Sequence, residues 1–290
     1  KINIVNRTIL AFVFFSTWGI YLTVSLNKLI KVLHNKNYKN YGMETFFTPF
    51  DIEKMGFPVK ETGYYIADPE FAQIIRTAFN LNYSIFGYEC GSPEECPTPD
   101  LREEAQSQNI FNFIKNNKNK TIIHCGYDHA RIDANLSDRW GKKAMARRLA
   151  ELLPNKKILS IDQVQLSDNI NKSWNTQAYN SILKEFDIKE PSVLLDGNDN
   201  VFTDTLSTKK RFNIQLVQPL YETIKTQKKA YLLSGNKSGY IFIYNKFEYN
   251  AIKNKNELIP LEINQVINGR FYSGIMNFSD SELIFFVEEQ

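Results

Sequence analysis

Short apolar runs alternate with amphipathic stretches of helical length over most of this chain, and this alternation restricts the fold more than any other feature. The runs end at Glu44, Glu89, His124, Asp162 and Asp196. Between them, apolar residues recur at the spacing of one helix face. Because strands separated by helices of this length pair in parallel, we predict an α/β fold with a mainly parallel sheet, helices on both faces and a β-richer C-terminal extension.

The C-terminal part of the chain has more β-type runs, at residues 212–217, 229–233, 239–244 and 282–287. Their aromatic and β-branched residues are typical of strand packing rather than of a ligand platform. We therefore expect an α/β core domain over residues 1–200, with an anomalous apolar segment at 8–26. Residues 201–290 would form a β-rich extension of that domain or a small subdomain.

The charged residues indicate a solvated surface rather than a nucleic-acid interface. The chain has 35 basic and 32 acidic residues among 290, which gives a net charge of +3. A charge this small creates no field that would attract a polyanion, and we find no motif that reads DNA or RNA. We therefore predict no nucleic-acid partner. A small-molecule or peptide substrate is a separate expectation that does not rest on the charge.

One stretch of the core is unusual, because no charged residue occurs from Thr8 to Leu26. This length is close to the roughly 20 residues that a bilayer-spanning helix needs, so the stretch predicts membrane association. Arg7 before it and the lysines after it would then place most of the protein on the cytoplasmic side. Against a spanning helix, the preceding residues 1–5 have the pattern of a short strand.

The strand ends bring candidate functional residues together. In a parallel sheet the carboxyl ends lie along one edge, where ligands bind, so Glu44, Glu89, His124 and His129 would meet there. Gly126 allows the turn that brings His129 back over the end of its strand. Carboxylates next to imidazoles change one another's proton affinity, which suits acid–base catalysis or the binding of a cation.

Two further acidic strand ends have a simpler interpretation. Asp162 and Asp196 are typical of residues that cap the next helix or turn a loop. With only three histidines in the chain, any metal would take a mixed shell of imidazole and carboxylate ligands. The cofactor is unknown at this level, and a divalent metal and haem both stay open.

An ordered series of short motifs runs through the core between roughly Tyr41 and Gln163. It comprises residues 62–71, Ile75-Arg76-Thr-Ala78, Tyr88-Glu89, Arg102-Glu103 with Gln106 and Asn109, Gly126-Tyr-Asp-His129, and Trp140 through Met145-Ala146. This series resembles the erythromycin esterase-like branch of the haem-binding-uptake and Tiki (TraB-like) superfamily, of the Gly-x-x-His motif type. The resemblance implies an α/β core with one polar pocket. Members of the superfamily hydrolyse esters, act as metal-dependent peptidases or bind haem.

The resemblance also assigns roles to individual residues. His129 matches the late histidine of the Gly-x-x-His motif, Glu89 the pocket carboxylate and Arg102 the pocket arginine. A guanidinium suits this position because its planar fork of donors fits an oxyanion or a carboxylate. We therefore take His129, His124, Glu89, Arg102 and Glu44 as the candidate catalytic residues.

The chain departs from this superfamily at its beginning. Members carry an acidic residue followed by histidine just after the first strand, whereas here Asn6 is followed by Arg7 and then by the uncharged stretch. A membrane segment has replaced the motif, or the protein has lost catalysis and kept binding, or the coding frame is shifted between about Asn6 and Leu26. Our hypothesis favours the frame shift, since sequence of the expected type stands on both sides of the anomaly.

The cysteines bear on the compartment. Cys90 and Cys96 lie on either side of a Gly-Ser-Pro turn, and they either close a small disulfide loop in an oxidising compartment or remain loop thiols in the cytosol. A location in the cell envelope or periplasm is one expectation, and a cytoplasmic location stays open.

Two functions of different classes follow from these residues. The first is a hydrolase in which His129, helped by His124 or Glu89, transfers a proton while Arg102 stabilises the oxyanion of an ester or peptide substrate. The missing early motif puts its activity in doubt. The alternative is a non-catalytic haem- or metal-binding protein of the cell envelope.

Overall fold

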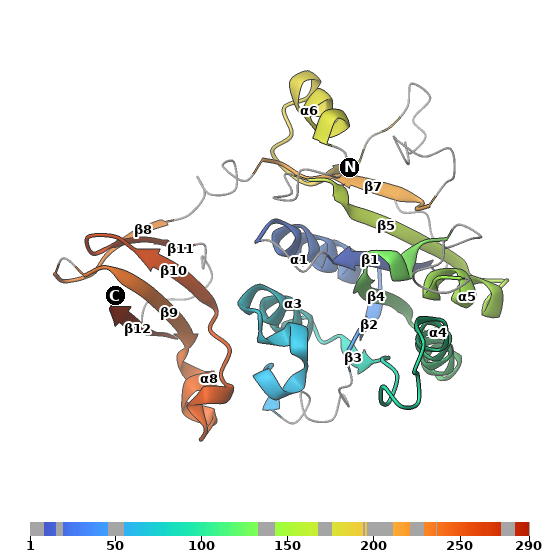
Figure 1. Cartoon of the computed structure of the whole chain (residues 1–290), viewed down its shortest axis with the longest axis horizontal. Helices are drawn as coiled ribbons and strands as arrows, with labels where there is room; N and C mark the ends of the chain where they lie inside the picture. Colours follow the sequence, from blue (N-terminus) through green and yellow to red (C-terminus); the bar gives the residue numbers. More distant parts are fainter. Residues whose placement is uncertain are drawn as a thin grey trace. The chain divides into compact units, whose positions relative to one another are not determined.

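The chain forms two compact units in the computed structural model (Figure 1), which describes residues 9–15, 20–45, 55–132, 143–167, 176–193, 195, 211–220, 229–235, 237–273 and 282–289. Unit 1 comprises Lys1–Pro49 and Ala78–Leu220, and unit 2 comprises Phe50–Thr77 and Tyr221–Gln290. This division differs from the predicted boundary at residue 200. Unit 1 continues to residue 220, and an early segment of the chain belongs to unit 2.

Unit 1 is built on a seven-stranded sheet with the strand order β3-β2-β4-β1-β5-β7-β6. The strands are β1 (Ile9–Phe15), β2 (Tyr38–Met43), β3 (Ser84–Gly87), β4 (Lys120–Gly126), β5 (Lys157–Leu166), β6 (Ser192–Val193) and β7 (Ile214–Val217). Neighbouring strands pair in parallel, except that β6 runs antiparallel to β7. The helices of this unit are α1 (Ile20–Asn35), α4 (Pro99–Asn116), α5 (Met145–Leu152), α6 (Thr176–Glu185) and the 3₁₀ turn η3 (Asp128–Ala130). The predicted α/β class is confirmed.

Helices cover both faces of this sheet. The alternation of β4 directs Ile123 and Cys125 into an apolar cluster with residues of α4 and α5. On the opposite face, His124 and Tyr83 both contact Tyr41, and the Tyr83 hydroxyl donates a hydrogen bond to a carbonyl of α1. Figure 1 shows α1 on one side of β2 and β4, with α4 and α5 on the other. His124 and Cys125, which are consecutive in β4, therefore lie on opposite faces of the sheet.

The uncharged stretch from Thr8 to Leu26 is divided between two elements. Its first part contains β1, which pairs with β4 on one side and β5 on the other, and its last part begins α1. A central strand of a parallel sheet is buried on both faces and reads as a continuous apolar run, so no shift of the coding frame is needed to explain this stretch. Within the described residues, no helix has the length and apolar character to cross a bilayer. The strand predicted at residues 1–5 lies outside the described residues.

The start of α4 is capped by Thr98, and the course of β5 differs from the prediction. The Thr98 hydroxyl accepts the N–H of Leu101 at 3.3 Å. β5 does not end at Asp162 but continues to Leu166, with a shift of register against β7 between these residues. Asp162 Oδ1 accepts the N–H groups of the residues two and three positions after it. Asp162 was expected to cap the next helix or turn a loop, whereas it lies within β5 and binds backbone of the same strand. Asp196 lies outside the described residues.

Unit 2 contains two antiparallel sheets, with the orders β10-β9-β12 and β11-β8. Its elements are η1 (Lys60–Thr62), η2 (Tyr64–Ala67), β8 (Lys229–Leu232), β9 (Gly239–Asn245), α8 (Lys246–Ala251), η4 (Lys255–Glu257), β10 (Glu262–Val266), β11 (Arg270–Ser273) and β12 (Leu283–Glu289). Helix α3 (Pro69–Asn80) begins in this unit and ends in unit 1. The early segment joins the C-terminal part because Phe57 and Val59 pack on Leu258, and Val59 also forms a β-bridge with it.

Candidate active site

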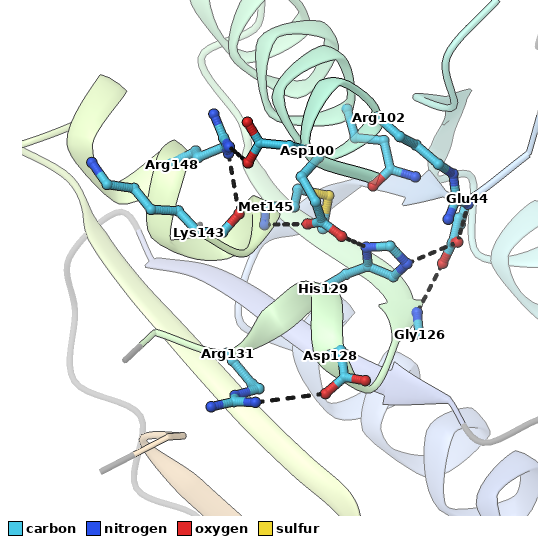
Figure 2. Close-up of polar contacts among 12 residues, drawn as sticks. Glu44, Asp100, Arg102, Gly126, Asp128, His129, Arg131, Lys143, Met145 and Arg148 are labelled. Atoms are coloured by element: carbon cyan, nitrogen blue, oxygen red, sulfur yellow. Dashed lines mark hydrogen bonds and ion pairs between the residues drawn. The ribbon is translucent and has the colours of Figure 1, made fainter. Parts of the chain in front are cut away.

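Three neighbouring strands of the sheet bring the candidate residues to one edge. In the order β3-β2-β4, Glu89 follows β3, Glu44 follows β2, and His129 lies in η3 just after β4. Carboxyl ends of adjacent parallel strands lie side by side, so residues far apart in the sequence become neighbours. Figure 2 shows Arg102 and His129 approaching Glu44 from different directions.

Glu44 is the centre of the cluster. Its Oε1 lies 2.6 Å from Arg102 Nη2 and 3.2 Å from His129 Nε2. Its Oε2 accepts the backbone N–H of Gly126 at 2.8 Å. Burial alone would raise the pKa of Glu44, but the charge and hydrogen bond of His129, the charge of Arg102 and the Gly126 N–H together lower it well below the usual range. Glu44 is therefore ionised at neutral pH.

His129 is held between two carboxylates. Its Nε2 faces Glu44, and its Nδ1 lies 2.5 Å from Glu103 Oε1. Burial alone would lower the pKa of His129, but Glu44 and Glu103 raise it well above the ordinary value of 6.5. The imidazole is therefore doubly protonated at neutral pH. A side chain at Gly126 would meet the imidazole, since an added Cβ would lie 3.1 Å from His129 Cδ2.

Glu103 links this histidine to a helix start. The carboxylate comes from α4 and is 1% exposed, and its second oxygen accepts the N–H of Met145, the first residue of α5, at 2.5 Å. A carboxylate at this position satisfies a free helix N–H and interacts favourably with the helix dipole. Arg148 of α5 also binds Asp100 of α4 at 2.5 Å, so the two helices are linked a second time. Because Glu103 binds the Met145 N–H with one oxygen and faces His129 Nδ1 with the other, it orients the imidazole.

Arg102 and Glu89 form the second half of the cluster. The guanidinium binds Glu89 through two nitrogens, with Nε 3.0 Å from Oε1 and Nη2 in contact with Oε2. Glu89 also accepts Gln106 Nε2 on both oxygens and the N–H of Cys90. These contacts raise the pKa of Arg102 further above its usual value. Glu89 is fully engaged as the partner that holds Arg102 in place.

His124 does not join this cluster. Because side chains alternate along β4, it faces the side of the sheet that α1 covers, where its Nδ1 lies 2.7 Å from the Tyr41 hydroxyl. Burial lowers the pKa of His124 to about 3, so it is neutral at physiological pH. Both histidines were expected at one pocket, but of the two only His129 joins the cluster.

A pocket of about 180 Å³ lies beside the cluster. Its described lining comprises Cys96, Pro97, Thr98, Pro99, Arg102 and Glu103. Cys96 forms a disulfide with Cys90, so the alternative of a closed loop, which the sequence left open, is the one in this structure. The disulfide connects the residue after Glu89 with the wall of the pocket.

The strand ends predicted Glu44, Glu89, His124 and His129 at one edge, and the resemblance added Arg102. Neither gave a role to Glu103 or Gln106. Both are buried on α4, on the same helix face as the core residue Ile110. Polar residues at the core positions of a helix need buried partners, and this is the signal that would have pointed to them.

The described residues offer no grouped set of metal ligands. Within the described ranges, no group of three or more His, Cys, Asp or Glu side chains is arranged to hold a metal ion. Asp128 and Arg131 make a separate pair at 3.8 Å, which Figure 2 shows apart from Glu44. A divalent metal or haem as ligand therefore stays a prediction.

Comparison with known proteins gives little further information. No protein-family model matches this chain, and no curated protein matches it. Two solved structures are similar in part. One, described as "Bacterial protein toxins", has 10% identity and a TM-score of 0.37 over 54% of this chain, and the match spans 35% of its own length. The other, described as the type III effector HopBA1, has 12% identity and a TM-score of 0.36, covering 58% of this chain and 84% of the effector.

Proposed function

We propose that unit 1 is a hydrolase domain of the erythromycin esterase-like branch of the Tiki superfamily, which cleaves an ester or a peptide with His129 as the proton-transfer residue. One observation carries this proposal: the imidazole is held at Nδ1 by Glu103 and at Nε2 by Glu44, while Arg102 shares the same Glu44 oxygen. A carboxylate that orients a histidine is a recurring part of acyl-transfer sites, and a positioned donor such as a guanidinium can stabilise an oxyanion.

The protonation states suggest how the roles are divided. His129 carries a proton on each nitrogen at neutral pH, so we assign it the transfer of a proton to the leaving group. Glu44 is ionised and we assign it the proton of the attacking water. The proton then returns from Glu44 to His129 across the 3.2 Å between Oε1 and Nε2. Arg102 stabilises the oxyanion that forms on the carbonyl oxygen.

This assignment changes the partners that the sequence suggested for His129. His124 and Glu89 were expected to assist it, whereas Glu103 and Glu44 are the carboxylates within reach. Glu89 instead holds the guanidinium of Arg102. The proposal therefore needs no residue from the early acidic-plus-histidine motif.

We also propose a location in the cell envelope or periplasm, because the Cys90–Cys96 disulfide is of the kind that persists in oxidising compartments. The alternative function, binding of haem or a metal without chemistry, is supported by no comparable group among the described side chains. The division of the apolar stretch between β1 and α1 adds no support for membrane association.

A panel of p-nitrophenyl esters and a fluorogenic peptide mixture tests the proposal on the whole chain. We expect turnover by the wild type and a loss of at least about 100-fold for His129→Asn. His34→Asn is the matched control, since His34 lies in the last turn of α1, and it should retain wild-type turnover. Equal rates for the wild type and His129→Asn would refute the hydrolase. A thermal shift with haem or Zn²⁺ in the absence of any turnover would favour the binding protein.

A further inference from the structure

The pocket beside the cluster is too small for a whole drug-sized ligand. Its volume of about 180 Å³ lies below the roughly 300 Å³ at which ligand pockets begin. With about 30 Å³ for each water-sized group, it holds about six non-hydrogen atoms. The pocket therefore fits one end of a substrate.

The walls of the pocket are mainly apolar. Pro97, Pro99 and the disulfide-bonded Cys96 offer carbon and sulfur surface. The first turn of α4 has few donors left for an anion, because Pro99 has no N–H and the N–H groups of Leu101 and Arg102 bind Thr98. This part of the pocket suits a carbon chain better than a carboxylate or a phosphate.

The charges around the pocket also disfavour an anionic ligand. Arg102 and His129 are the two cations of the cluster, and they face the three carboxylates of Glu44, Glu89 and Glu103. Three carboxylates against two cations leave the cluster with a net negative charge, which disfavours a permanently charged carboxylate in the pocket. The side chain of Arg102 is still 32% exposed, and Nε and Nη2 make its contacts with Glu44 and Glu89. Nη1 can therefore donate to an uncharged carbonyl oxygen.

We propose that this pocket binds the acyl end of the substrate, and that it selects a short, uncharged acyl group of up to about six non-hydrogen atoms whose carbonyl oxygen faces Arg102. The inference rests on the proposed function and deepens it by naming a substrate class. Pro97 and Thr98 limit the length of the acyl chain. An acyl group that carries a carboxylate is rejected.

The test compares p-nitrophenyl acetate, butyrate, hexanoate, octanoate and hemisuccinate on the whole chain. We expect kcat/KM to be at least about tenfold lower for octanoate than for butyrate, since one extra methylene in a hydrophobic pocket costs about 10- to 200-fold. A similar loss is expected for hemisuccinate, because its carboxylate would face the carboxylates of the cluster. Pro97→Phe, which fills the pocket, should move the preference to acetate. Pro154→Phe is the matched control, because Pro154 is equally exposed but is not among the lining residues.

A binding readout separates this inference from the proposed function. We expect butyramide to raise the melting temperature of the wild type and of Pro154→Phe but not of Pro97→Phe. If no ester is turned over but this pattern of shifts is seen, the proposed hydrolase function is refuted and the acyl pocket is supported. If esters are turned over with no dependence on acyl length or charge, or if butyramide stabilises Pro97→Phe as well as the wild type, the acyl pocket is refuted.

Discussion

Two arginine–glutamate arrangements in this protein differ in their burial, in the number of their partners and in whether they border a pocket. In unit 2, Arg76 binds the single carboxylate of Glu248 with two hydrogen bonds of 2.7 Å and donates a third to the carbonyl of Ile259. The side chains are 5% and 8% exposed. This pair connects α3 with α8 and has no solvent-facing part for a ligand to reach.

Arg102 in unit 1 is arranged differently. It binds two carboxylates, one of which also faces the protonated His129, and it is 32% exposed beside a pocket. Placing three carboxylates within reach of two cations costs desolvation that simple packing would avoid. The comparison shows that two arginines with carboxylate partners differ in the number of carboxylates they share and in their exposure, and these two differences underlie the proposed role of Arg102.

The largest effect on folding should come from breaking the Arg76 pair. Glu248→Ala would leave an unpaired buried guanidinium, and we expect the free energy of unfolding to fall by about 3–5 kcal/mol, measured by urea denaturation. Lys143→Ala is the control, because its ion pair with Glu151 is exposed on both sides and should contribute less than about 1 kcal/mol. If Glu248→Ala lowers the free energy of unfolding by a similarly small amount, the Arg76–Glu248 pair does not contribute substantially to the stability of the fold.

A crossed pair of substitutions tests the comparison directly. Arg76→Lys and Arg102→Lys both keep the charge and remove the two-pronged geometry. We expect Arg76→Lys to cost about 1.5–3 kcal/mol of stability with turnover little changed. Arg102→Lys should reduce turnover at least about tenfold with a smaller loss of stability. If the two variants lose stability and activity in the same proportion, the distinction between the two arginines is wrong.

Much of this architecture follows from sequence pattern. The strand ends predicted Glu44, Glu89 and His129 at one edge because period-two alternation and parallel pairing act locally. His124 was assigned wrongly for the same reason, since alternation within β4 directs it away from His129. The partner of Arg76 depends on a contact between residues 172 positions apart, and no local pattern encodes such a contact. The stretch from Thr8 to Leu26 was ambiguous in sequence because a central parallel strand and a membrane segment are both apolar.

The Cys90–Cys96 disulfide offers a smaller test on the Arg102 side. Replacing both cysteines by serine should lower the free energy of unfolding by about 2 kcal/mol, because the closed loop is short. Turnover should fall as well, since the loop carries the Cys90 N–H that binds Glu89. Dithiothreitol should have the same effect on the wild type and no effect on the serine variant. Turnover unchanged by reduction would show that Glu89 holds Arg102 without help from the loop.

The smallest and most gradual effect concerns pH, and it tests the histidine that sets the Arg102 cluster apart. The lowered pKa of Glu44 contributes stability that is present above its ordinary value of 4.5 and is lost as the pH falls towards the folded value. The raised pKa of His129 contributes stability that is present below 6.5 and is lost as the pH rises through the folded value. The stability difference between the wild type and His129→Gln should therefore be greatest between pH 4.5 and 6.5 and decline on the alkaline side.

His124 in β4 provides the opposite case, five residues before His129. Because its pKa is lowered to about 3, its protonation in the unfolded chain removes stability as the pH falls below 6.5. The difference between the wild type and His124→Gln should therefore shrink towards acid pH, while the difference for His129→Gln holds down to about pH 4.5. Urea denaturation of both variants from pH 4 to pH 9 measures the two slopes. Slopes of the same sign would mean that His129 is a buried neutral histidine like His124, and the proton-transfer role proposed for it would have to be abandoned.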